Sequence, residues 1–259
     1  MPTMVSPVPI FNRVPKVTAD FWFIKLMAVT MGETAADYLS VQLGLGLSAT
    51  SVLMSAVLIA AILWQFSQKK YVPAPYWLTV VLISIVGTLI TDNLVDNFHV
   101  PLLVTTIGFS IALAVTFAVW FAVERTLSIH SVFTTRREIF YWLAILFTFA
   151  LGTAAGDLVA EQFSLGYLSS GILFGMIIAS LSLGYFVFGL DNILAFWLIY
   201  ILTRPLGASF GDLLSQPHQY GGFGLGTILT SAIFLLSIVG IVVYMSFKHE
   251  GEESTALGD

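Results

Sequence analysis

Eight apolar stretches of about 20 residues each fill most of the sequence. A helix needs about 20 apolar residues to cross a bilayer, because each residue adds about 1.5 Å. The predicted spans are about residues 20–42, 47–67, 76–96, 100–124, 139–161, 166–189, 191–214 and 224–247. We therefore expect an all-α integral membrane protein, a single bundle of eight transmembrane helices joined by short connections.

The composition agrees with this fold class. Of 259 residues, 58% are hydrophobic and 10% are charged, whereas roughly a quarter of a soluble domain is charged. The net charge of -5 is small and dispersed, which argues against nucleic-acid binding. The sequence has no Cys, which excludes disulfides and thiolate metal sites. We expect no cleaved signal peptide, because no short apolar run precedes the first span.

Basic residues lie on one side of the predicted bundle. They occur before span one, between spans two and three, between spans four and five, and after span eight. These residues are Arg13, Lys16, Lys69, Lys70, Arg125, Arg136, Arg137 and Lys248. By the positive-inside rule both termini are expected in the cytoplasm. The predicted parts are a cytoplasmic N-terminal segment 1–19, a transmembrane domain 20–247 and a cytoplasmic polar tail 248–259, whose last ten residues are expected to be disordered.

The odd-numbered spans share one motif, (F/Y)-W-x9-G-x4-D-x-(L/V), and align without gaps. Its four copies contain Trp22, Gly32 and Asp37; Trp77, Gly87 and Asp92; Trp142, Gly152 and Asp157; and Trp197, Gly207 and Asp212. Each copy begins a unit of two spans, so all units have the same orientation. The units cover about residues 20–67, 76–124, 139–189 and 191–247. We expect four parallel hairpin repeats, arranged as a pseudo-fourfold ring or two by two, and not inverted repeats.

These motifs resemble those of a known family of bacterial inner-membrane proteins. Its members contain four tandem repeats of unknown function, each with two transmembrane segments and a characteristic Trp. The resemblance covers about residues 14–247. It implies the eight-helix architecture and the bacterial inner membrane, but no activity.

Three residue types in the odd spans have simple structural explanations. The repeated Trp residues are expected near the cytoplasmic surface, where aromatic rings favour headgroup depth. The repeated Gly residues are expected to let helices approach closely. Lys25 is expected to extend its ammonium group to the cytoplasmic headgroups.

The four repeated Asp residues carry more functional information. Each lies 15 residues after its Trp, about 22 Å along a helix and thus in the outer half of the membrane. One interpretation is a ring of carboxylates that binds a cation, formed by Asp37, Asp92, Asp157 and Asp212. The alternative is structural: each carboxylate reaches the aqueous interface near its helix end, or accepts hydrogen bonds from the backbone of a neighbouring helix and ties one hairpin to the next. The sequence leaves both interpretations open.

Glu33 breaks the repeat, because it follows Gly32 where the other copies have a neutral residue. The equivalent residues are Thr88, Thr153 and Ala208. Glu33 shares a helix face with Asp37, four residues later. Two carboxylates can hold a divalent cation or share a proton, so Glu33 and Asp37 are the predicted metal ligands.

Arg204 breaks the repeat in the seventh span. It lies near the middle of that span and needs an anionic partner. Glu33 is one helical turn further along its own repeat, so we expect an ion pair between them. Pro205 follows directly and favours a kink.

The leading functional hypothesis is a transporter or channel for a small cation, either a divalent metal or a proton-coupled ion. Its candidate binding residues are Glu33, Asp37, Asp92, Asp157, Asp212 and Arg204. The alternative is a membrane scaffold or interaction protein in which the Asp residues lock helices together. A third possibility, a site for a hydrophobic small molecule, rests on aromatic content alone. No catalytic motif is present, so we expect no enzyme and no cofactor; the expected partners are the lipid bilayer and a small cation, without nucleic acid.

Overall fold

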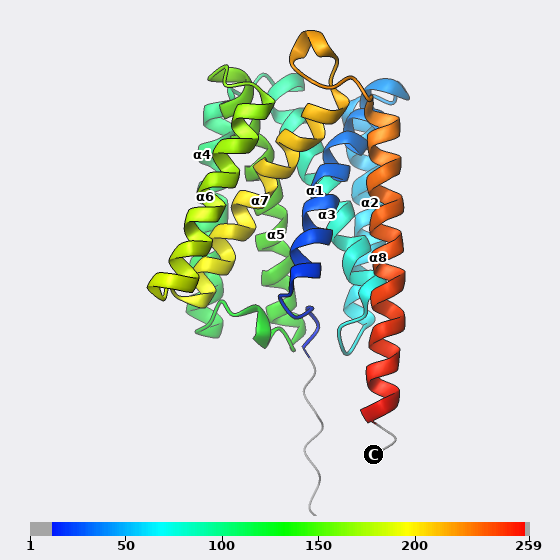
Figure 1. Cartoon of the computed structure of the whole chain (residues 1–259), viewed down its shortest axis with the longest axis vertical. Helices are drawn as coiled ribbons and strands as arrows, with labels where there is room; N and C mark the ends of the chain where they lie inside the picture. Colours follow the sequence, from blue (N-terminus) through cyan, green and yellow to red (C-terminus); the bar gives the residue numbers. More distant parts are fainter. Residues whose placement is uncertain (1–11, 257–259) are drawn as a thin grey trace, which may run out of the picture.

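The computed structural model describes residues 12–256, with side chains as far as residue 247, and within that range it has eight long helices (Figure 1). They are α1 Ala19–Asp37, α2 Leu47–Ser67, α3 Pro73–Asp92, α4 Leu102–Glu124, α5 Thr135–Asp157, α6 Tyr167–Phe188, α7 Asn192–Ser215 and α8 Thr227–Ala256. Each helix overlaps a predicted span. Helix α8 runs through most of the tail that was expected to be disordered, and residues 257–259 lie outside the described part.

Seven of the helices in the described range are long and apolar enough to cross a membrane. The exception is α1, which carries Asp20, Lys25, Glu33 and Asp37 within 19 residues. A helix with so many charges needs other helices to shield it from lipid. Helix α1 has this protection, because it packs against α3, α7 and α8.

The odd-numbered helices form an inner ring. Helix α1 packs on α3, α3 on α5, α5 on α7, and α7 on α1. In the most apolar part of α3, α5 and α7, between 56% and 67% of residues are buried, against 6% to 17% in α2, α4, α6 and α8. The even-numbered helices therefore form an outer layer around the ring, and the arrangement is pseudo-fourfold and not two by two.

Each outer helix packs mainly on the inner helix of the next repeat. Helix α2 lies on α3, α4 on α5, α6 on α7, and α8 returns to α1 (Figure 1). The short connections 68–72 and 189–191 hold α2 to α3 and α6 to α7. The compact pairs thus differ from the hairpins expected within each repeat: they are shifted by one helix along the chain.

The aromatic residue and the Trp of each motif join neighbouring repeats. The ring that precedes each Trp packs on the Trp of the next inner helix, with centroid distances of 5.4 to 6.3 Å. The pairs are Phe21 with Trp77, Tyr76 with Trp142, Tyr141 with Trp197, and Phe196 with Trp22. These contacts close a ring of aromatic side chains at the end of the bundle where the inner helices begin, which we call the Trp end.

The expected position of the Trp rings among lipid headgroups is therefore wrong for three of them. Trp77, Trp142 and Trp197 are at most 4% exposed, so their rings lie inside the bundle. Trp22 is half-buried. Aromatic partners on the neighbouring inner helices bury these rings more completely than an interface with lipid would.

The repeated Gly residues confirm the predicted packing role. Each faces a side chain three residues before the Gly of the next repeat. The pairs are Gly32 with Ser84, Gly87 with Phe149, Gly152 with Arg204, and Gly207 with Val29. A Cβ at any of the four would lie within 2.9 Å of that side chain, closer than real Cβ contacts. The glycines thus let four inner helices cross at one level.

Candidate functional site in the inner ring

Glu33 and Arg204 form an ion pair inside the ring, as the sequence predicts. The Arg204 Nη2 to Glu33 Oε2 distance is 2.7 Å, and the two side chains are 0% and 8% exposed. The same nitrogen lies 2.6 Å from Thr153 Oγ1 and also contacts Thr88 Oγ1. Thr88 Oγ1 lies 3.3 Å from the same Glu33 oxygen. This network joins α1, α3, α5 and α7.

The repeated Gly of the third motif makes room for Arg204 at the centre of the ring. Its side chain passes Gly152, where an added Cβ would lie 2.1 Å from Arg204 Cγ. Its guanidinium carbon lies 5.8 Å from the centre of the Phe149 ring, within range of a cation–π interaction. Arg204 Nε and Nη1 are buried and have no hydrogen-bond partner in the described part of the chain. Two of its three nitrogens are thus not used by hydrogen bonds within the described range.

Lys25 is a second buried cation, and its predicted extension to the headgroups is wrong. The side chain is 0% exposed. Its Nζ donates to the Tyr200 carbonyl oxygen at 2.8 Å and to Thr203 Oγ1, and lies 3.9 Å from the centre of the Tyr200 ring. A carbonyl, a hydroxyl and an aromatic face offer enough polar contact to hold the ammonium inside the bundle.

Three acidic groups meet at the opposite end of the ring, which we call the Asp end. One carboxylate oxygen from each of Glu33, Asp157 and Asp212, on α1, α5 and α7, lies within 4.8 Å of the other two. We call these three residues the acid cluster. Asp37 and Asp92 are outside it, although each interacts electrostatically with Glu33. The predicted metal ligand Glu33 is therefore grouped with Asp157 and Asp212, and ligation by Asp37 stays a prediction.

The four repeated Asp side chains make no hydrogen bond or ion pair to any other residue between 12 and 247. This argues against the form of the structural hypothesis in which each Asp accepts a hydrogen bond from a neighbouring helix, and leaves open the form in which it reaches the aqueous interface. The inter-helix bonds at this level involve neighbouring hydroxyl and amide groups instead. One example is Thr91 Oγ1 of α3, which donates to the Ala150 carbonyl oxygen of α5 at 3.0 Å.

The backbone changes at the repeated Asp in three of the four copies. Asp37, Asp92 and Asp157 end their α-helices, and each is followed by a π-helical turn: η1 Tyr38–Gln42, η2 Asn93–Asn97 and η4 Leu158–Gln162. Such turns frequently occur at functional sites. The fourth copy differs, because Asp212 lies within α7, which ends at Ser215 just before Pro217.

Sequence reasoning missed that Lys25 belongs to the buried polar side chains of the inner ring. A signal was available, because Lys25 lies eight residues before Glu33 and therefore near the same helix face. The equivalent residues in the other repeats are Val80, Ile145 and Tyr200. Between the Trp and the Asp of the motif, Lys25, Glu33 and Arg204 are thus the three charged departures from the repeat, and all three point into the ring.

The architecture defines a class of protein: a multi-pass helical protein of the membrane type, built from four tandem two-helix repeats. The chain belongs to the Repeat of Unknown Function (DUF347) family, whose model matches residues 21–71, 75–126, 140–189 and 195–250. Comparisons with curated proteins and with solved structures find no significant match.

Proposed function

We propose that this protein binds a small cation at the acid cluster and moves it along the inner ring. The observation that carries this proposal is the approach of three carboxylates within 4.8 Å, with Asp157 and Asp212 making no hydrogen bond to the described residues. Carboxylates so close together repel one another unless a cation or a proton lies between them. Carboxylates that served only to stabilise the fold would not need to lie so close together.

The ligand chemistry suits a hard cation. Carboxylate oxygens are the ligands that Mg²⁺ and Mn²⁺ prefer, and carboxylates in contact also share protons. The hydroxyl groups of Thr88 and Thr153 lie beside Glu33 through their contacts with Arg204. The proposed cargo is therefore a divalent metal or an ion coupled to protons.

Arg204 acts in this proposal as an internal competitor for Glu33. Its guanidinium occupies Glu33 Oε2 at 2.7 Å. A cation bound by the acid cluster draws on the same carboxylate and weakens the ion pair. Cation binding at the Asp end and release of Arg204 from Glu33 are then coupled. The inner ring therefore has two states, one with the ion pair formed and one with the cation bound.

The proposed setting is the bacterial inner membrane with both termini in the cytoplasm, so the Trp end faces the cytoplasm. We propose no catalysis and no cofactor for this role. The outer helices support a lipid setting, because α2, α4, α6 and α8 expose large apolar side chains such as Val52, Ile111 and Leu236.

A scaffold without transport is the second candidate. The Arg204 network supports it, because one side chain contacts residues of the three other inner helices. In this case the network would hold the ring together, and the acid cluster would be a consequence of the repeat. The two candidates differ in what happens when an Asp charge is removed.

The test uses the purified protein in lipid vesicles that contain a pH-sensitive dye or a dye quenched by Mn²⁺. Asp157→Asn and Asp212→Asn each keep the shape of the side chain and break no hydrogen bond. We expect each to lower flux at least about ten-fold, equivalent to about 1.4 kcal/mol of lost cation binding, with the melting temperature unchanged. Asp96→Asn is the matched control, because Asp96 is exposed and outside the acid cluster. Wild-type vesicles without flux of protons or Mn²⁺, or full flux in both variants, would reject the proposal.

A further inference from the structure

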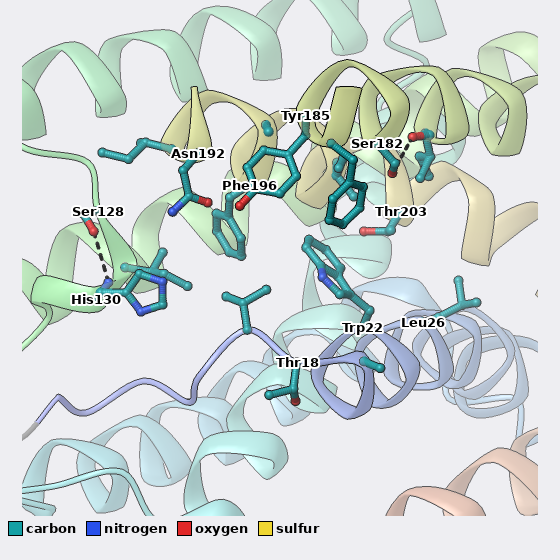
Figure 2. A pocket seen from close by; sticks show the side chains of 18 of the residues that line it. Thr18, Trp22, Leu26, Ser128, His130, Ser182, Tyr185, Asn192, Phe196 and Thr203 are labelled. Carbon is teal, nitrogen blue, oxygen red and sulfur yellow. Dashed lines mark hydrogen bonds between the residues drawn. The ribbon is translucent and has the colours of Figure 1, made fainter. Parts of the chain in front are cut away.

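A cavity of about 700 Å³ opens at the Trp end, outside the inner ring. It lies between the beginning of α1, helices α6 and α7, and the connection that contains η3 Ile129–Ser131 (Figure 2). Helix α8 contributes no residue to its described lining. The size is typical of sites for small organic molecules, which are about 300 to 1,000 Å³.

Trp22 differs from the other repeated Trp residues at this cavity. Three indole N–H groups donate within the protein: Trp77 to Tyr71 Oη at 3.1 Å, Trp142 to Glu138 Oε1 at 3.4 Å, and Trp197 to the Leu127 carbonyl oxygen at 2.9 Å. Trp22 Nε1 has no acceptor in the part of the chain that the structure describes. The Trp22 ring is half-buried and extends from α1 into the cavity (Figure 2). The repeat therefore provides a donor here that the fold itself does not use.

Among the described residues, the lining has no Asp, Glu, Lys or Arg. Its walls are mostly apolar, with Leu26, Phe196 and Ile199 among them, and its polar groups include the hydroxyl groups of Ser182 and Thr203. A charged ligand would lose its hydration without gaining a counter-charge, at a high cost in free energy. An organic cation is excluded further by Lys25, whose Nζ donates to Thr203 Oγ1 directly behind the wall.

From these features we infer that the cavity binds a neutral, mostly apolar organic molecule whose carbonyl or hydroxyl oxygen accepts a hydrogen bond from Trp22 Nε1. The apolar walls bury the body of the molecule, and the indole N–H fixes its orientation. Such a combination, an apolar pocket with few directed polar groups, is usual for small-molecule sites. This site is separate from the acid cluster and does not depend on cation transport.

Thr203 lies between the cavity and the buried Lys25. Its hydroxyl group lines the cavity, accepts a hydrogen bond from Lys25 Nζ, and donates to the Tyr200 carbonyl oxygen at 2.8 Å. A molecule in the cavity therefore contacts the side chain that holds the buried ammonium group. Occupancy of the cavity and the position of Lys25 are linked through one residue.

The experiment uses benzophenone, a neutral diaryl ketone, as the probe for the full-length protein in lipid nanodiscs. Under ultraviolet light its carbonyl abstracts a hydrogen atom from a nearby C–H group, and the two radicals combine into a C–C bond and a tertiary alcohol. Mass spectrometry then locates the labelled peptides. We expect labelling that saturates with benzophenone concentration in the segments 17–26 and 192–206.

Trp22→Phe keeps an aromatic ring and removes the N–H group. We expect the half-saturating concentration to rise about five-fold, the effect of one lost hydrogen bond. Trp64→Phe is the matched control, because Trp64 lies on α2, is 47% exposed and is outside the cavity. Ser182→Phe places a ring in the cavity and should abolish saturable labelling, with a wild-type melting temperature as evidence that the fold is intact.

Three results would overturn the inference. Labelling that does not saturate and spreads over α2, α4 and α8 would show only partition of the probe into lipid. An unchanged half-saturating concentration in Trp22→Phe would remove the role of the indole N–H. Saturable labelling in detergent that disappears in nanodiscs would show that a lipid chain takes the cavity.

Discussion

Two buried glutamates, one at each end of the bundle, have contrasting surroundings. Glu138 lies near the Trp end, and both of its oxygens have partners. Its Oε2 is 2.7 Å from Arg13 Nη1, while its Oε1 accepts from Gln65 Nε2 at 3.0 Å and Trp142 Nε1 at 3.4 Å. Nearly every acceptor position of this carboxylate is used within the fold.

Glu33 is also buried, with its side chain 8% exposed against 1% for Glu138, but its hydrogen-bond partners all contact one oxygen. Arg204 and Thr88 contact Oε2, and no residue of the described range donates to Oε1. Beyond it lie the carboxyl groups of Asp157 and Asp212. The two glutamates show two uses of a buried carboxylate: one with all its partners built in stabilises the fold, whereas one with a spare oxygen beside other carboxyl groups suits an exchangeable ligand.

The largest expected effect tests the Glu33 side of this comparison. Arg204→Met removes the cation and leaves a buried carboxylate, so we expect a loss of about 3 kcal/mol in the free energy of unfolding in detergent. The double variant Glu33→Gln with Arg204→Met removes both charges and should recover much of that stability. Arg136→Met is the control, since Arg136 is 67% exposed. A single variant as stable as the wild type would mean that the ion pair contributes nothing to the fold.

Glu138→Leu should have the next largest effect, about 2 kcal/mol, because it leaves Arg13 and Gln65 without their acceptor. The cost is smaller than for Arg204→Met because the Arg13 side chain is already 15% exposed and can regain water. In the protein that folds, cation flux should stay at the wild-type level. Lost flux with intact folding would contradict the division between a structural and a functional glutamate.

The smallest effect is expected for the hydroxyl groups around Arg204. Thr153→Val removes one hydrogen-bond acceptor of Arg204 and should lower the free energy of unfolding by about 1 kcal/mol. Thr148→Val is the matched control on the same helix, because among the described residues the Thr148 hydroxyl group bonds only to the Ala144 carbonyl oxygen one turn earlier. Equal losses in the two variants would show that Thr153 does not support the guanidinium.

The sequence allowed the helices, their repeat and the ion pair of Glu33 with Arg204 to be predicted. Apolar length and fixed spacing determine these features directly, because a motif repeated four times brings equivalent residues to one level. The shift of each outer helix onto the next repeat was not predicted, because short connections occur both before and after the outer helices and so do not choose between their two neighbours. Lys25 was misplaced for a related reason. Its contacts are a carbonyl oxygen and a hydroxyl group of α7, and neither is visible as a charge of opposite sign.

The polarity of α1 has a consequence for biosynthesis. Of the eight helices, α1 is translated first, but its charged side chains find partners far along the chain: Lys25 at Tyr200, 175 residues later, and Glu33 at Arg204, 171 residues later. Helix α8, the last of the eight in chain order, also packs against α1. These polar contacts of α1 can therefore form only after α7 has been translated, and its contact with α8 only after all eight helices have been made.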